Sequence, residues 1–231
     1  MLVELAVFHP GSVAIAERCG VDRIELCTNY AQGGLSPDMD FFSSVRKEFS
    51  NPVFVMIRPR PGNFEYSGEE ILWMKEAIKR YASAGADGFV LGCLQGKKVD
   101  IASLELLVKC AGVKPVTFHR AIDQAADYQE GIEELINSGC SRLLSTGQAA
   151  TAAEGAEKIA QTITDYGNQI KFLAGGGVRS SSVNLLRSIS GLEEVHTAAI
   201  TAKGEVADEE ELNKIICFWK TKSAIAGASG E

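Results

Sequence analysis

The sequence has few histidines, scattered cysteines and no long apolar run. Three histidines occur among 231 residues, and the six cysteines include no C-x-x-C pair. This pattern indicates reduced thiols, as in a cytoplasmic protein, rather than a disulfide scaffold. No segment approaches the roughly 18 consecutive apolar residues of a membrane span, and no basic segment followed by a long apolar one stands at the N-terminus. We therefore expect a cytoplasmic protein that is not inserted in a membrane.

The chain is also short of basic residues. Lysine and arginine number 23 against 30 aspartate and glutamate residues, which gives a formal net charge of −7. An acidic surface repels the phosphates of nucleic acids and anionic lipid headgroups, so neither is an expected partner. The hydrophobic fraction of 45% is sufficient for the core of a globular protein.

Eight short β-rich runs alternate with segments of helical periodicity. The runs are residues 3–7, 23–27, 53–58, 88–91, 116–119, 142–145, 170–174 and 193–196. This alternation predicts an α/β protein with a single (β/α)8 TIM-type barrel over residues 1–222, followed by a disordered tail at 223–231. A doubly wound sheet is the competing fold. It would need a glycine-rich phosphate loop after the first strand, where the sequence reads "VFHPGS".

Side-chain alternation along the predicted strands directs several charged groups into the barrel. In the first strand Val3 and Leu5 suit the helix side, which leaves Glu4 inside. The same reasoning directs four further polar side chains inward, namely Glu25, Arg58, His119 and His196. Isolated buried charges are costly, so these groups must pair with one another or bind a ligand. Both a structural ring of ion pairs and a ligand site remain open.

The carboxyl ends of barrel strands surround the mouth where barrel enzymes hold their active sites. "VTFHRAID" (116–123) ends a strand there, and "STGQ" (145–148) and "AGGGVRSS" (174–181) supply glycines whose N–H groups can approach an anion. The alternative reading of the glycine triplet is a tight turn. The candidate anion-binding residues are Arg58, Arg60, Ser145, Gly147, Gly175, Gly176 and Gly177.

Acid/base chemistry is assigned to Glu25 and His119, with Asp123 orienting either Arg120 or His119. An aldolase with a Schiff-base lysine is not indicated, because the sixth strand has Leu144 and Ser145 where that lysine is expected. The sequence therefore leaves open an isomerase, lyase or hydrolase that acts on a small anionic or phosphorylated substrate.

Taken together, the motifs resemble the CutC family. The segments that carry the resemblance are "DRIELC" (22–27), "GGLSPD" (33–38), "PVFVMIRPRPGNFEYS" (52–67), "GADGFVLGCL" (85–94), "VTFHRAID" (116–123), "LLSTGQAATAAEG" (143–155) and "AGGGVRSSSV" (174–183). They cover roughly residues 1–200. The resemblance implies a cytoplasmic barrel protein of copper homeostasis that binds copper(I). It also implies a homo-oligomer. The apolar segment "IICFWK" (215–220) favours packing against the barrel, with an interface between copies as the alternative.

The resemblance further implies a copper(I) site made by one cysteine on each of the first two strands. Copper(I) prefers sulfur ligands. Cys27 matches the second cysteine, whereas the first falls at Ala6. Cys27 is therefore the candidate metal ligand, with Cys93 and Met56 as further sulfur donors. A divalent metal is an alternative, opposed by the nearby arginines; its ligands would come from Glu4, Glu25, His119, Asp123 and His196.

Overall fold

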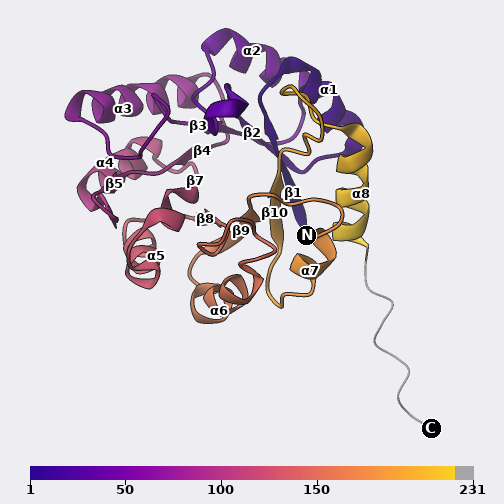
Figure 1. Ribbon diagram of the computed structural model, residues 1–231. Coiled ribbons are helices and arrows are strands. Elements are labelled where there is room, and N and C mark those ends of the chain that lie inside the picture. Colours follow the sequence, from indigo (N-terminus) through magenta and orange to yellow (C-terminus); the bar gives the residue numbers. More distant parts are fainter. Residues whose placement is uncertain (222–231) are drawn as a thin grey trace.

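The computed structural model describes residues 1–221, in which the strands close into a parallel barrel surrounded by helices (Figure 1). The barrel strands are β1 (Leu2–Val7), β2 (Arg23–Leu26), β3 (Val53–Met56), β4 (Gly88–Leu91), β7 (Val116–Phe118), β8 (Arg142–Ser145), β9 (Lys171–Gly175) and β10 (Glu194–Thr197). Around the barrel they follow the order β1-β10-β9-β8-β7-β4-β3-β2. The predicted (β/α)8 barrel is confirmed, while the tail predicted at 223–231 lies outside the described residues.

Helices cover the outside of the barrel (Figure 1). They are α1 (Pro10–Cys19), α2 (Met39–Glu48), α3 (Gly68–Ser83), α4 (Ile101–Ala111), α5 (Tyr128–Asn137), α6 (Ala156–Tyr166), α7 (Val183–Arg187) and α8 (Glu209–Lys220). Two short strands, β5 (Leu94–Gln95) and β6 (Lys98–Val99), form a separate hairpin, and two 3-10 turns are η1 (Tyr30–Gln32) and η2 (Arg120–Gln124). Within the described residues no helix is both long enough and apolar enough to cross a membrane.

Local sequence accounts for the ends of these elements. Ser67 and Glu70 form a capping box that begins α3, because each side chain accepts a hydrogen bond from the other residue's backbone N–H. The third predicted run is shorter than expected, since β3 ends at Met56. Its ladder stops because the Arg58 N–H donates to the Ser36 hydroxyl at 2.8 Å and Pro59 has no N–H to continue the pairing.

The main apolar core lies between the strands and the helices. Val3, Leu5 and Val7 of β1 are fully buried in it, as the alternation predicts. On α8 the side chains of Ile215 and Trp219 also join this core, so most of the "IICFWK" face packs against the barrel. Burial of apolar surface stabilises such a core by roughly 25 cal/mol per Å².

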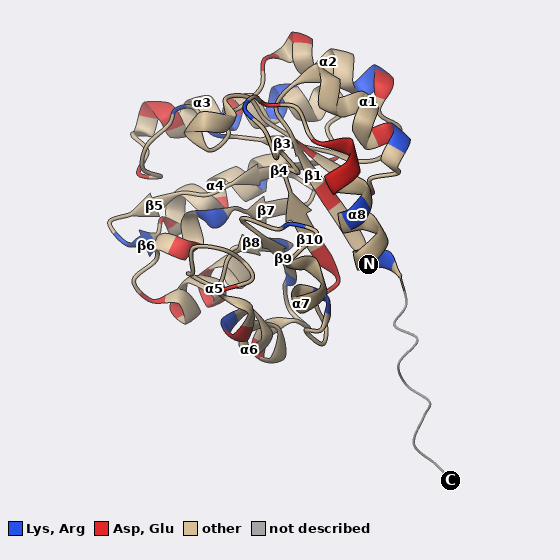
Figure 2. Cartoon of the chain, turned by 45° about the vertical axis from the view of Figure 1, so that its right-hand side comes forward, with Lys and Arg blue, Asp and Glu red and all other residues tan. Residues whose placement is uncertain are grey.

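Inside the barrel a small apolar cluster and several charged groups share the space. The apolar cluster contains Cys27, Phe54, Met56 and Val90. Figure 2 shows charged positions on the strands as well as on the outer helices. These interior charges are paired: Arg23 contacts both Glu4 and Glu194, and Arg142 contacts Glu194 at 2.6 Å. The strand alternation predicts the inward direction of Glu4, and the closed barrel supplies its partner Arg23 from the neighbouring strand.

Candidate functional site

A cavity of about 640 Å³ opens at the carboxyl ends of the strands. Seven of the predicted site residues line it, namely Glu25, Cys27, Arg58, His119, Asp123, Gly176 and Gly177. His196, Arg120 and Arg179 line it as well. Four predicted residues, Arg60, Ser145, Gly147 and Gly175, are not part of the cavity wall. The mouth of the barrel therefore holds the site, with a different set of residues from the one predicted.

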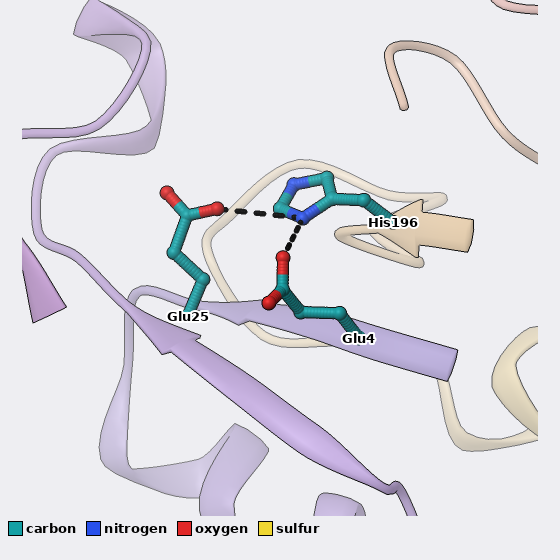
Figure 3. Close-up of side chains that lie close together, drawn as sticks. All are labelled: Glu4, Glu25 and His196. Atoms are coloured by element: carbon teal, nitrogen blue, oxygen red, sulfur yellow. Dashed lines mark hydrogen bonds and ion pairs between the residues drawn. The ribbon is translucent and has the colours of Figure 1, made fainter. Parts of the chain in front are cut away.

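Glu4, Glu25 and His196 lie close together (Figure 3), and Glu25 and His196 also line the cavity. His196 Nδ1 lies 2.8 Å from Glu4 Oε1 and 3.3 Å from Glu25 Oε2. Strand pairing produces this geometry, because Glu4 is in register with His196 and Glu25 is in register with Ala6. Ala6 leaves room beside Glu25 for the imidazole that bridges the two carboxylates.

The groups around the cluster shift the pKa values of its three members in different directions. Burial disfavours the charged form of Glu4, but Arg23 and His196 together outweigh it and lower the pKa of Glu4 to about 2. Burial raises the pKa of Glu25, despite the opposing effect of His196. Burial lowers the pKa of His196, but the two carboxylates outweigh this effect and the net shift is upward. Glu4 therefore stays ionised, and the mobile proton belongs to Glu25 and His196.

His119 is buried on the far side of the cavity and has a different role from the one predicted. Its Nδ1 accepts a hydrogen bond from the Ala121 N–H at 3.2 Å, which leaves the ring proton on Nε2. Nε2 has no hydrogen-bond partner within residues 1–221. Burial, aided by Arg58, lowers the pKa of His119 to about 3. His119 is thus a neutral hydrogen-bond donor. Glu25 pairs with His196 instead, because β10 lies two strands from β2 and β7 lies three.

Asp123 organises the loop after β8. One carboxylate oxygen accepts from the Ser145 hydroxyl at 2.5 Å and from the Gln148 N–H at 3.2 Å, and the other accepts from Arg120 Nε at 3.3 Å. The Thr146 N–H also donates to this carboxylate. The predicted contact between Asp123 and Arg120 is present. Both carboxylate oxygens accept from donors of the chain itself, so Asp123 holds Arg120 and the loop after β8 in position.

The loop after β8 does not bind an anion in the predicted way. The buried Ser145 hydroxyl donates to Asp123, while its oxygen accepts from the Gly147 N–H at 2.8 Å. A Cβ on Gly147 would lie 2.8 Å from the Gly155 carbonyl oxygen, so this glycine is needed for packing. The anion-binding assignments of Ser145 and Gly147 are corrected accordingly: both residues hold the loop in shape.

Most N–H donors of the two arginines predicted to bind an anion already have acceptors within the protein. Arg58 Nη1 donates to the carbonyl oxygens of Gln32 and Gly34, both at 2.9 Å, and Nη2 donates to Gly62 at 3.0 Å. Arg58 therefore joins two loops at the mouth, and its Nε has no partner within the described chain. Arg60 forms an ion pair with Glu70 at 2.5 Å away from the cavity wall. The structure contradicts the role of Arg60 as an anion clamp.

The loop after β9 places Gly176 and Gly177 on the cavity wall with positive φ angles of 102° and 70°. A side chain is disfavoured at both positions. Gly175 has another reason for being glycine, since a Cβ there would lie 2.5 Å from Leu144 and 2.9 Å from His196. Its assignment to anion binding is corrected to a packing role within the strand.

The predicted sulfur ligand lies beside the carboxylate pair. The buried Cys27 thiol donates a hydrogen bond to Glu25 Oε1 at 3.2 Å. Burial and the charge of Glu25 raise the pKa of Cys27 well above its ordinary value. Met56 lines the same cavity and belongs to the same apolar cluster. This site offers one thiol and one thioether, with Ala6 in place of a second thiol.

A divalent cation has fewer ligands than the sequence suggested. Glu4, Glu25 and His196 each offer an atom within 4.8 Å of the other two. His119 and Asp123 lie outside this group. A protonated His196 and a metal ion exclude each other at Nδ1, and the buried Arg23 beside Glu4 further opposes a cation.

Two residues of the site were not assigned to acid/base chemistry or anion binding by the sequence reasoning. The sequence places His196 inside the barrel and offers it only as a ligand of a divalent metal, since the partners it meets, Glu4 and Glu25, are near the other end of the chain. Arg120 was treated as a target of Asp123 and not as part of the cavity wall. The signal for both was their position at the carboxyl end of a predicted strand.

Comparisons with known proteins agree with the barrel fold. The model of the CutC family matches residues 1–201. A curated relative named family protein CutC, from Xanthomonas campestris pv. campestris (strain 8004), is 38% identical over 208 residues, which cover 90% of this chain and 85% of the relative. A protein of the same name from Pasteurella multocida (strain Pm70) is 37% identical over 198 residues, covering 85% and 81%.

Solved structures show the same fold. A crystal structure named for the copper homeostasis protein CutC of Streptococcus agalactiae has a TM-score of 0.81 at 29% identity, covering 87% of this chain and 100% of that one. Thiamine phosphate pyrophosphorylase from Pyrococcus furiosus has a TM-score of 0.63 at 14% identity, covering 94% and 95%, and shows a shared fold alone. The chain belongs to the CutC family, whose model spans all eight barrel strands described above.

Proposed function

We propose that the chain is an enzyme of the isomerase, lyase or hydrolase type that acts on a small anionic substrate at the barrel mouth. The observation that carries this proposal is the Glu25–His196 pair at the wall of a cavity that is also lined by Arg120 and Arg179. Proton-transfer groups beside cationic groups, in a cavity of about 640 Å³, are typical of a site for a small charged metabolite.

Acid/base catalysis follows from the separated proton affinities. Arg23 keeps Glu4 ionised, and Glu4 orients His196 through Nδ1. Glu25, with its raised pKa, is then the carboxylate that accepts a proton from the substrate, and the His196 imidazolium stabilises the negative charge that develops. The neutral His119 Nε2–H is a donor for an oxygen that gains charge in the transition state.

Solvent exchange tests this proposal before a substrate is identified. Small carboxylates and phosphorylated metabolites would be screened for thermal stabilisation of the protein and then incubated with it in D₂O. We expect deuterium incorporation into a bound compound, detected by NMR, and a loss of roughly 10²–10⁴-fold in Glu25→Gln. The control is Glu76→Gln, since Glu76 is exposed on α3. Exchange at the wild-type rate in Glu25→Gln would remove Glu25 from the mechanism.

Copper homeostasis, with copper(I) bound through Cys27, is the second candidate function. Membership of the CutC family and the name of the S. agalactiae protein support it. Cys27 and Met56 both line the cavity, so a thiolate and a thioether are available, and Glu25 is placed to accept the thiol proton. The raised pKa of Cys27 and the alanine at position 6 limit the affinity of such a site.

Anaerobic titration with copper(I) against a competing chelator tests this candidate. We expect one-to-one binding that is lost in Cys27→Ser and retained in Cys93→Ser, whose thiol is buried elsewhere and donates to the Asp100 carbonyl oxygen. Equal affinities of the wild-type protein and Cys27→Ser would separate the chain from copper(I) binding at this cavity.

We also propose that the protein acts in the cytoplasm and forms a homo-oligomer. All six cysteines are free, which supports a reducing compartment. The half-exposed Phe218 on α8 is the part of the "IICFWK" face that remains available to a second copy. Light scattering of the wild-type protein and of Phe218→Ser would test self-association through this face: the mass would fall in the variant.

A further inference from the structure

We propose that the loop after β9 and the side chain of Arg120 form a phosphate subsite, so that the substrate is a phosphomonoester. The inference rests on the proposed function, since it names the anionic group of the substrate that Glu25 and His196 would act on. It depends on three features of the cavity wall: unpartnered backbone donors, one guanidinium with free donors, and the position of both beside His196.

The backbone donors are on two neighbouring loops. Gly176, Gly177 and Val178 follow β9, Ala198 follows β10, and all four line the cavity. The N–H of Gly176 continues the β9–β10 ladder, because Gly175 is in register with His196. The N–H groups of Gly177, Val178 and Ala198 have no acceptor within residues 1–221. Consecutive N–H groups at positive φ form a concave site for an anion, and donors at a cavity wall require an acceptor.

The neighbouring loop after β8 provides a contrast within the same molecule. There the N–H groups of Thr146 and Gln148 donate to Asp123, and that of Gly147 donates to Ser145. These donors are consumed by the protein itself. The loop after β9 is thus the glycine loop of this cavity with donors left for a ligand.

Arg120 supplies the positive charge. Its Nε donates to Asp123 at 3.3 Å, whereas its Nη groups have no partner among the described residues, and about half of the side chain is exposed. A Cβ on Gly176 would lie 3.2 Å from Arg120 Cζ, so the guanidinium lies directly against the loop. Arg179 differs, because its Nη groups donate to the carbonyl oxygens of Val178 and Ile200. Arg120 is therefore the arginine with donors for phosphate oxygens.

The position of the subsite fits the proposed chemistry. Gly175, at the end of β9, is in register with His196, which places the loop next to the proton-transfer pair. A phosphate bound there leaves most of the 640 Å³ cavity for the rest of the molecule, toward Glu25. The Asp123 carboxylate lies beside Arg120 and weakens the positive field there, but its oxygens accept from Arg120 Nε, the Ser145 hydroxyl and backbone N–H groups, while the Arg120 Nη groups remain available within the described chain.

Calorimetric titration with inorganic phosphate at constant ionic strength tests the subsite in the full chain. We expect saturable phosphate binding, weakened at least about tenfold in Arg120→Gln and partly restored in Arg120→Lys. Arg18→Gln is the matched control, because Arg18 is also a half-exposed, ion-paired arginine but lies outside the cavity. Circular dichroism of each variant confirms that it is folded. Acetate, titrated in parallel, should bind more weakly than phosphate.

The outcomes separate this inference from the proposed function. Equal phosphate affinities of the wild-type protein and Arg120→Gln, or acetate binding as tight as phosphate binding, would overturn the subsite while leaving proton transfer by Glu25 in place. Conversely, Arg120-dependent phosphate binding supports the subsite even if no phosphomonoester exchanges deuterium, a result that would remove the isomerase and lyase forms of the proposed enzyme function.

Discussion

At the residue scale, two buried histidines illustrate how neighbours decide chemistry. His196 lies between two carboxylates and holds its proton, whereas His119 is enclosed beside Arg58 and loses it. The side chains are chemically identical and both line the cavity. The difference comes from the charge of the nearest groups, since burial alone favours the neutral form of each.

We expect the two imidazoles to titrate in opposite directions from the ordinary value of 6.5. In NMR spectra of ¹⁵N-labelled protein, His196 should remain protonated above pH 6.5, while His119 should stay neutral down to about pH 3 if the fold persists. Glu25→Gln should lower the pKa of His196, because that carboxylate is the main group that favours its charge. A common midpoint for both rings would contradict the assigned environments.

The direction of each histidine pKa shift also determines how the stability of the fold changes with pH. The raised pKa of His196 means that its proton stabilises the fold below pH 6.5, and this contribution is lost as the pH rises through the folded-state pKa. The lowered pKa of His119 contributes stability above pH 6.5 that is lost as the pH falls toward 3. The comparison of His196→Gln and His119→Gln in urea unfolding against pH measures the two contributions separately.

At the scale of elements, the loops at the carboxyl ends have distinct tasks. Arg58 joins the loop that contains Gln32 and Gly34 to the loop that contains Gly62, and Asp123 fixes the loop after β8. In the loop after β9 the N–H groups of Gly177 and Val178 have no acceptor within the described chain, whereas those of Arg179 and Ser180 donate to Ser182 and Glu211. Three loops are thus held by the chain itself, and the glycine part of the loop after β9 keeps donors for a ligand.

Removing the Arg58 guanidinium should loosen the first of these loops. In Arg58→Met we expect faster hydrogen exchange at the amides of Gly33, Gly34 and Leu35. The variant loses the hydrogen bonds from Arg58 that hold the carbonyl groups of Gln32 and Gly34 in the same loop. Arg60→Met is the matched control, since Arg60 contacts Asn63, Glu65 and Glu70 instead. Exchange mass spectrometry gives the readout, and unchanged protection in Arg58→Met would contradict the framing role.

The loop after β9 should not tolerate a side chain at Gly176. We expect Gly176→Ala to lower the free energy of unfolding by about 1–3 kcal/mol, through strain at positive φ and contact with Thr146 and Arg120. Gly96→Ala is the control, because Gly96 has a φ of 62° and open space around a Cβ. Urea unfolding of both variants isolates the contact effect, and equal losses would contradict it.

At the scale of the whole molecule, a chain of charges crosses the barrel interior. Arg142, Glu194, Arg23, Glu4, His196 and Glu25 are linked in succession by ion pairs. Phe54 lies between two members of this chain, with the guanidinium carbons of Arg23 and Arg142 at 4.8 and 5.5 Å from its ring centroid. The network anchors the Glu25–His196 pair to the base of the barrel.

Breaking this network should be costly. We expect Arg23→Met to lower the free energy of unfolding by about 3–5 kcal/mol near neutral pH, because Glu4 is left buried without its cation. Since the pKa of Glu4 is about 2 in the folded protein and 4.5 is its ordinary value, its stabilising contribution is present above pH 4.5 and lost as the pH falls toward 2. The difference between variant and wild type should therefore shrink below pH 4.5.

Urea unfolding over this pH range provides the measurement. Arg18→Met serves as the control, because its exposed ion pair with Glu209 is screened by solvent and its loss should change stability little. A loss in Arg23→Met that is independent of pH would indicate that packing against Phe54, and not the charge of Glu4, is what Arg23 supplies.

The sequence by itself determined the barrel and the inward direction of Glu4, Glu25, Arg58, His119 and His196. Both are local properties, because the order of strands and helices and the two-residue period of a strand are contained in neighbouring residues. The resemblance to the CutC family extended this reading to most of the chain. The tertiary structure alone decided that Glu25 meets His196, that Ser145 and Arg58 serve their own loops, and that Arg120 keeps free donors. Those outcomes depend on strand register and barrel closure, which join residues as far apart as Glu4 and His196.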